Sequence, residues 1–148
     1  MRSYAAFFLM ALGVFFIDRS IKELFLEGLF IESRCITLGY VLNKGVAFSM
    51  FAFLGEYLKW ILLALIGAVL GYLFHAGLVK RHPLVFGMLI GAALSNLYDR
   101  FVYGGVIDYV YWHCGFDFAV FNLADVLIDL SIVFLIYFHF KSGRVAQG

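Results

Sequence analysis

The stretch from Trp60 to Val79, WILLALIGAVLGYLFHAGLV, contains a single side chain that can become charged near neutral pH, His75. A helix needs about 20 apolar residues to cross the hydrocarbon core of a bilayer, which is about 30 Å thick. This run has that length. The segment therefore predicts a membrane-spanning helix over residues 60–79.

The composition of the whole chain is that of a membrane protein. Of its 148 residues, 64% are apolar, 20% are aromatic and 14% are charged, whereas about 25% of the residues in a soluble domain are charged. A soluble fold of this size lacks the polar residues to cover so much apolar surface. The composition excludes an ordinary cytosolic protein, a disordered chain and a nucleic-acid-binding protein, and it makes membrane lipid the natural solvent.

Three further segments have the apolarity of spans. We expect an all-α integral membrane protein with a single domain, residues 1–148, and four transmembrane helices over residues 3–25, 60–79, 83–98 and 122–140. Lys and Arg concentrate in cytoplasmic loops. Five of the 11 basic residues and none of the ten carboxylates lie before the first span, between the second and third, or after the fourth. Both termini are therefore expected on the cytoplasmic side.

The first connection on the far side, about residues 30–58, is rich in β-forming residues. Two runs, Ile36–Leu42 and Val46–Phe51, flank the turn sequence Asn43–Gly45. This pattern predicts a small extracytoplasmic β-hairpin or cradle at the membrane surface. We also expect a short interfacial helix over Phe51–Lys59.

The chain contains two cysteines, Cys35 and Cys114, which are too few for a disulfide framework. A single bridge between them is one alternative. We favour the other, two buried free thiols.

Polar side chains gather where the helices reach the far side of the membrane. A charge at mid-membrane costs ~2.5–3.5 kcal/mol on insertion scales, so such a cluster calls for an explanation. We expect one shared polar pocket that opens to the far side. Its members are Asp18, Lys22, Asn96, Asp99, Arg100, Asp108, Asn122, Asp125 and Asp129.

Several of these residues have a structural interpretation. Asp18 and Lys22 are four residues apart, so they share a helix face. We expect a structural ion pair that anchors the first span, and we expect Asp99 to be a structural partner. Arg100 offers a planar, permanently charged donor fork that can orient a carbonyl. An interfacial snorkelling anchor is the alternative for Arg100.

Asp108 and Asp125 form the pair that can carry chemistry. If Asn122 caps the fourth span, Asp125 falls in its first turn, and antiparallel spans bring it level with Asp108. Two carboxyl groups in a partly dry pocket cannot both ionise easily, so one keeps its proton. Such a pair can activate a water and protonate a carbonyl, as peptide hydrolysis requires. Asp129 is the main rival of Asp125, and we expect it to be neutral and hydrogen-bonded to a Tyr or to Lys22.

The residues alone leave other classes open. Intramembrane carboxylates also serve proton-coupled transporters and ion sites, but the inner halves of the second and third spans offer almost no polar path. A purely structural membrane subunit is a third class, and the costly polar cluster argues against it. His113, Cys114 and Asp117 match no zinc spacing, so we expect no metal and no cofactor.

Four parts of the sequence resemble the bacterial lipoprotein signal peptidase (signal peptidase II) family. They are Asp18 with Lys22; Asn43–Phe48, NKGVAF; Asn96–Arg100, NLYDR, followed by Val106–Tyr109, VIDY; and Phe121–Asp125, FNLAD. The resemblance implies an integral-membrane aspartic endopeptidase. It would remove signal peptides from prolipoproteins that carry diacylglycerol on a cysteine, and it would cut just before that cysteine.

The resemblance also implies roles for single residues. Asp108 and Asp125 match the family's catalytic pair, and the matched substrate-binding positions are Asn43, Gly45, Asn96, Arg100 and Asn122. It implies a multi-pass protein of the bacterial cytoplasmic (inner) membrane, an active site near the outer face, and sensitivity to the cyclic peptide globomycin. We expect a monomer. The chain departs from the family at Asp129, where a small or neutral residue is usual.

Overall fold

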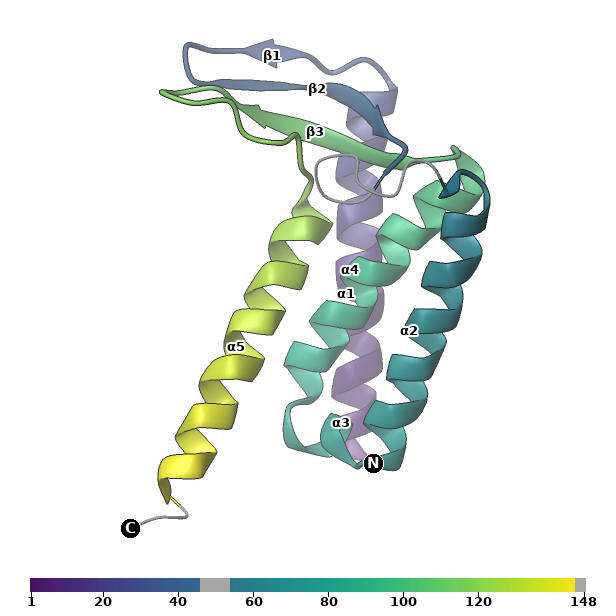
Figure 1. Cartoon of the computed structure of the whole chain (residues 1–148), viewed down its shortest axis with the longest axis vertical. Coiled ribbons are helices and arrows are strands. Elements are labelled where there is room, and N and C mark those ends of the chain that lie inside the picture. Colours follow the sequence, from purple (N-terminus) through teal and green to yellow (C-terminus); the bar gives the residue numbers. More distant parts are fainter. Residues whose placement is uncertain (46–53, 146–148) are drawn as a thin grey trace.

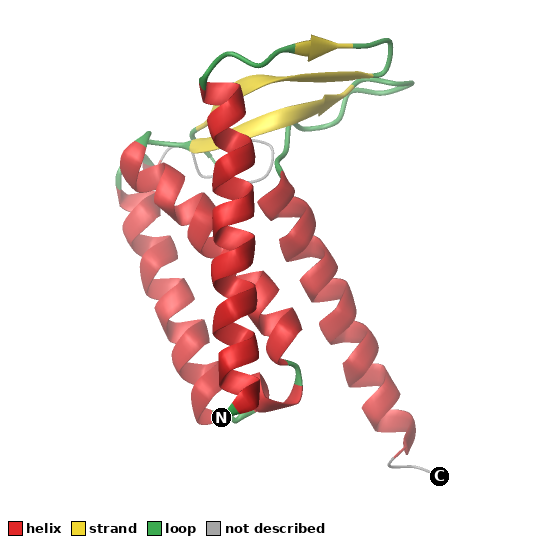
Figure 2. Cartoon of the chain, turned by 180° about the vertical axis from the view of Figure 1, so that it is seen from behind, coloured by secondary structure: helices red, strands yellow, loops and turns green. Residues whose placement is uncertain are grey.

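The computed structural model describes residues 1–45 and 54–145. In chain order the elements are α1 Arg2–Leu26, β1 Ile31–Glu32, β2 Ile36–Asn43, α2 Tyr57–His75, α3 Leu78–Arg81, α4 Pro83–Val102, β3 Val106–Trp112 and α5 Leu123–Val145. The long helices α1, α2 and α4 form a bundle, and α5 leans away from it toward the C-terminus (Figure 1). A small sheet covers one end of the bundle, as the reverse view also shows (Figure 2).

Three helices within the described residues are long and apolar enough to cross a membrane: Arg2–Leu26, Tyr57–His75 and the Leu123–Lys141 part of α5. The helix α4 has 20 residues, but its half nearest the sheet carries several polar side chains between Ser95 and Arg100. These polar groups interrupt the apolar sequence of α4 near its C-terminal end. The chain is a mostly helical membrane protein with a small antiparallel sheet.

The second helix is displaced from the predicted span over 60–79. It begins at Tyr57 and ends at His75, and Gly77 then takes φ +66° before the short helix α3. A glycine adopts this left-handed conformation without the steric cost that a Cβ atom brings. Pro83 opens α4, where its missing N–H has no helical partner to lose.

The interfacial helix predicted over residues 51–59 lies partly within the described residues. Leu54 is in a 3₁₀-helical conformation, Gly55 and Glu56 form a turn, and Tyr57–Lys59 belong to the first turn of α2. Residues 51–53 lie outside the described part of the chain. The last three residues of the predicted segment therefore belong to α2, which begins at Tyr57.

The sheet has the strand order β1-β2-β3, and both strand pairs are antiparallel (Figure 1). Strand β2 confirms the first strand of the predicted hairpin, whereas the second predicted strand, 46–51, lies outside the described residues. The strand β2 pairs with β1 on one side and with β3, Val106–Trp112, on the other, and the sequence pattern predicts neither neighbour. The sequence of β3, VIDYVYW, has the β-branched and aromatic residues typical of a strand.

A disulfide joins the ends of two strands. Cys35 precedes β2 and Cys114 follows β3, and the register pairs Ile36 with Trp112. The two cysteines are 79 residues apart in sequence, and their sulfurs are bonded. The prediction of two free thiols is therefore wrong, because the antiparallel register of the missed strand places the cysteines side by side.

Close packing of α1 against α4 depends on glycine. A Cβ atom on Gly91 would lie 2.3 Å from the carbonyl oxygen of Ala11, and one on Gly87 would lie 2.6 Å from that of Phe7. Both separations are far shorter than a van der Waals contact, so only glycine permits this approach. The approach brings the polar end of α1 against the polar end of α4.

We expect Gly91→Ala to lower the free energy of unfolding by about 1–3 kcal/mol, because the added methyl overpacks the α1–α4 contact. Gly67→Ala on α2 is the matched control, since a Cβ atom there would meet nothing within 4 Å. Thermal unfolding of the detergent-solubilised protein measures both. Equal melting temperatures for the two variants would contradict the glycine-dependent packing.

Candidate active site

Asp108 lies on β3 and is only 1% exposed. Val41 pairs with it across the sheet, so Asn43, two residues further along β2, lies diagonally on the same face. Asn43 Nδ2 donates to Asp108 Oδ2 at 2.9 Å, and Asn122 Nδ2 donates to Asp108 Oδ1 at 2.7 Å. Burial raises the pKa of Asp108 to about 6, although both hydrogen bonds lower it, and the nearby Asp125 carboxylate adds to the rise.

Asp125 is held by the start of α5. Asn122 precedes the first helical residue, and its Oδ1 accepts the backbone N–H of Asp125 at 2.9 Å. In return, Asp125 Oδ2 accepts the backbone N–H of Asn122 at 3.1 Å. Such reciprocal bonding between an N-cap and the third helical residue is a capping box. It confirms the predicted cap and the place of Asp125 in the first turn.

Asn122 is also the residue that connects the two aspartates. Its side-chain amide contacts Asp108, and its backbone N–H contacts Asp125. Asn122 is fully buried, so this connection lies inside the protein. The structure thus brings the two predicted acidic groups within reach of one asparagine.

Asn96 on α4 holds the other oxygen of Asp125. Asn96 Nδ2 donates to Asp125 Oδ1 at 2.8 Å. Asn96 Oδ1 accepts from Lys22 Nζ at 2.8 Å and from Asn122 Nδ2 at 3.1 Å. Two donors on its oxygen fix the orientation of the Asn96 amide, so that its nitrogen must face Asp125.

Lys22 is completely buried among acceptors. Its Nζ lies 2.7 Å from Asp18 Oδ2 and 2.7 Å from Asp99 Oδ2, and all three side chains have no exposed surface. The predicted Asp18–Lys22 ion pair is confirmed, and Asp99 is part of it. Asp18 further accepts the Ala124 N–H at 3.0 Å and the Ser95 hydroxyl at 2.6 Å. One carboxylate of α1 therefore binds both α4 and the start of α5.

Arg100 is buried rather than snorkelling, with 8% of its surface exposed. Its Nη2 donates to the carbonyl oxygen of Gly45 at 2.5 Å. The Gly45 N–H in turn donates to Asn43 Oδ1 at 3.0 Å. Arg100 therefore orients a carbonyl of its own chain, beside the asparagine that binds Asp108.

Two further residues of the site escaped the sequence analysis. Arg19 Nη1 lies 2.5 Å from Asp99 Oδ1. Arg19 is also four residues from Glu23, a spacing that could have identified it as a member of an ion pair. The Tyr109 hydroxyl accepts the Leu123 N–H at 3.0 Å. Burial raises the pKa of Tyr109 to about 12. No local pattern marks this tyrosine, because its partner lies on another element.

The expectation for Asp129 is wrong. Its side chain is exposed on α5 and makes no hydrogen bond or ion pair with the described residues. Lys22, its expected partner, is occupied by Asp18, Asp99 and Asn96. Asp129 lies one turn beyond Asp125, where α5 leans away from the bundle (Figure 1).

Residues 1–45 and 54–145 contain no group of three or more His, Cys, Asp or Glu side chains placed to hold a metal ion. The chemistry that this arrangement offers comes from two carboxyl groups whose oxygens accept hydrogen bonds from asparagines. One of the two carries a pKa near 6, so the pair can hold a single proton in mildly acidic solution.

Replacing Lys22 by Met should cost about 3–5 kcal/mol of unfolding free energy, because it leaves the Asp18 carboxylate buried without its counter-ion. Lys59→Met is the control. Lys59 pairs with Glu56, whose side chain is 76% exposed, and surface pairs contribute about 0–1 kcal/mol. Chemical unfolding in detergent measures both variants, and equal losses would contradict a special role for the buried lysine.

The chain is similar to known proteins over nearly its whole length. It is 58% identical over 136 residues to the lipoprotein signal peptidase of Sulfurovum sp. (strain NBC37-1), which covers 92% of this chain and 93% of the relative. It is 47% identical over 143 residues to that of Helicobacter pylori (strain P12), covering 92% and 91%. The chain has the same fold as a bacterial membrane enzyme whose structure was determined by the in meso method at 2.3 Å resolution. The TM-score is 0.78 and the sequence identity 22%, and the match covers 94% of this chain and 90% of that one.

The profile of the family described as signal peptidase (SPase) II matches residues 10–141. That range includes both aspartates, the three asparagines that bind them, and the buried Asp18–Lys22 pair. The chain belongs to the signal peptidase II family.

Proposed function

We propose that Asp108 and Asp125 are the catalytic pair with which this signal peptidase II, an aspartic peptidase, removes signal peptides from prolipoproteins. The single observation that carries the proposal is the bonding of Asn122 to both carboxyl groups. It supports a shared site for two acids that come from different elements, β3 and α5.

In the proposed mechanism one aspartate is ionised and takes a proton from water, while the other is protonated and donates to the scissile carbonyl. The tetrahedral diol then collapses, and a proton passes to the leaving amine. Coupled carboxyl groups titrate as a pair, so the proton belongs to the site rather than to one residue. The asparagine donors stabilise whichever carboxylate is ionised.

The proposed substrate carries diacylglycerol on a cysteine, and the cut falls just before that cysteine. Asn43, Gly45, Asn96, Arg100 and Asn122 form the proposed substrate-binding set. Their hydrogen bonds to the two aspartates, to Gly45 or to one another support this assignment. A globomycin-type cyclic peptide is the proposed inhibitor.

We place α4 in the membrane as a fourth span, with both termini in the cytoplasm of a bacterium and the sheet at the outer face of the inner membrane. The segments at the bundle end opposite the sheet carry basic residues and no acidic ones. The Cys35–Cys114 bond at the sheet supports the same orientation, because disulfides persist in oxidising compartments. The proposed state is a monomer.

Asp108→Asn and Asp125→Asn should each reduce cleavage of a purified lipidated prolipoprotein by on the order of 10²–10⁴-fold or more, since each removes a proton-transferring group. A gel-shift assay measures the product. Asp117→Asn is the control, because Asp117 accepts a hydrogen bond from Tyr111 in an exposed position outside the proposed pair. Near-normal cleavage by both folded active-site variants would refute the assignment.

The pH profile of cleavage should report the titration of the acidic pair, to which Asp108 contributes. The pKa of Asp108 is raised from the ordinary 3.8 to about 6. The stabilisation of the folded protein by protonated Asp108 is therefore complete below pH 3.8 and is lost as the pH rises through about 6. Asn43→Ala removes a hydrogen bond that favours the carboxylate, which raises this pKa further. We expect the inflection of kcat/KM near pH 6 to move to higher pH in Asn43→Ala.

Thr37→Ala is the matched control for that profile. Thr37 lies on the same strand as Asn43 but bonds His113 instead. We expect its inflection to stay at the wild-type pH. A downward movement in Asn43→Ala, or the same movement in both variants, would contradict the role given to Asn43.

A further inference from the structure

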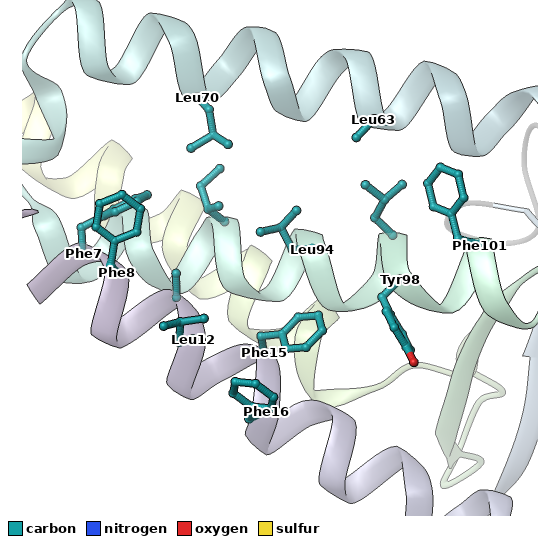
Figure 3. A pocket seen from close by; sticks show the side chains of 13 residues that line it. Phe7, Phe8, Leu12, Phe15, Phe16, Leu63, Leu70, Leu94, Tyr98 and Phe101 are labelled. Carbon is teal, nitrogen blue, oxygen red and sulfur yellow. The ribbon is translucent and has the colours of Figure 1, made fainter. Parts of the chain in front are cut away.

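An apolar cavity of about 620 Å³ lies between α1, α2 and α4 (Figure 3). On α4 it is lined by the face that carries Leu94, Tyr98 and Phe101. Asn96, which belongs to the proposed active site, is two residues from Leu94 and therefore about 200° round the helix from it. Asn96 thus lies on a different face of α4 from the cavity lining. The cavity is therefore separate from the proposed catalytic pair.

The cavity has the depth of one leaflet of a membrane. Its lining on α1 runs from Phe7 to Phe16, a rise of about 14 Å at about 1.5 Å per residue. Half of a hydrocarbon core about 30 Å thick is about 15 Å. At the end nearest the sheet, Tyr57 and Trp60 are 75% and 58% exposed, as is typical of side chains at a membrane interface.

Two cationic side chains lie at the end of the cavity nearest the sheet. Arg19 Cζ lies 4.9 Å from the centroid of the Tyr98 ring, and Lys59 Nζ lies 5.5 Å from that of Phe101. Both rings line the cavity. A molecule whose chain fills the cavity would therefore place its polar end beside these two cations, of which Arg19 also binds the buried Asp99.

Carboxylates lie one turn further out on both helices. Arg19 pairs with Glu23 at 3.2 Å, and Lys59 pairs with Glu56. The helix α1 runs toward the sheet and α2 runs away from it (Figure 1), so each glutamate lies nearer the interface than its cation. Glu27 adds a further negative charge on α1, beside Glu23 in a hollow of the surface. On α1 and α2, the order of these charges from the cavity outward is positive and then negative.

We propose that this cavity binds one acyl chain of a phospholipid from the leaflet on the sheet side, with a zwitterionic headgroup that ends in a primary ammonium. The phosphate of such a lipid lies next to the glycerol and meets the cations, and its ammonium lies further out and meets the glutamates. An anionic headgroup supplies no positive group for those glutamates. A trimethylammonium headgroup supplies the charge but no N–H donor.

Native mass spectrometry of the full chain in detergent tests the site, with three probes that share their palmitoyl and oleoyl chains: phosphatidylethanolamine, phosphatidylglycerol and phosphatidylcholine. We expect one phosphatidylethanolamine to be retained with an affinity at least fivefold higher than either of the other two. Equal retention of the three lipids, or preference for phosphatidylglycerol, would overturn the proposed headgroup chemistry.

A matched pair of variants tests the cavity itself. Leu63→Trp fills it, whereas Leu65→Trp, two residues along α2, places the same ring on a surface that is 57% exposed and outside the lining. We expect the first to weaken phosphatidylethanolamine binding at least fivefold and the second to leave it within twofold. Leu70→Trp, also in the lining, replaces the first variant if that one unfolds. Equal binding by cavity and surface variants would overturn the proposal.

Discussion

The arrangement of the site depends on the ion pairs of the buried Lys22 ammonium group with Asp18 and Asp99. This ammonium group binds Asp18 on its own helix and Asp99 and Asn96 on α4. A charge without exposed surface is tolerable only when its partners are complete, so α1 and α4 must keep the separation that their glycine contact permits. Asp18 extends the same constraint to the first turn of α5. Three helices are thereby held at one level.

The two acidic groups are held by neutral amides rather than by cations. Asn43, Asn96 and Asn122 each donate to one of the carboxyl groups, and the lysine reaches Asp125 only through the amide of Asn96. A direct ion pair would keep a carboxylate ionised through most of the pH range, whereas amide donors favour it more weakly. Burial can then raise the pKa of Asp108 to about 6, and the pair can share a proton.

The features that the sequence predicts well are local. The spacing of four residues identifies the Asp18–Lys22 pair, and the Asn122 cap places Asp125, because both depend on the geometry of one helix. The pairing of β2 with β3, the Arg19–Asp99 bond and the Tyr109–Leu123 bond join residues that are distant in sequence, so no local pattern predicts them. The thiols and Asp129 were misjudged for the same reason, since their surroundings depend on tertiary packing.

The disulfide of the sheet closes a covalent ring of chain that contains α2, α3 and α4. The two strands that it joins carry Asn43 and Asp108, which are bonded to each other at their other end. On the proposed topology this bond forms only after the loops have been exported, where thiol oxidation occurs in bacterial envelopes. The covalent bond between the strands that carry Asn43 and Asp108 is then tied to the redox state of that compartment.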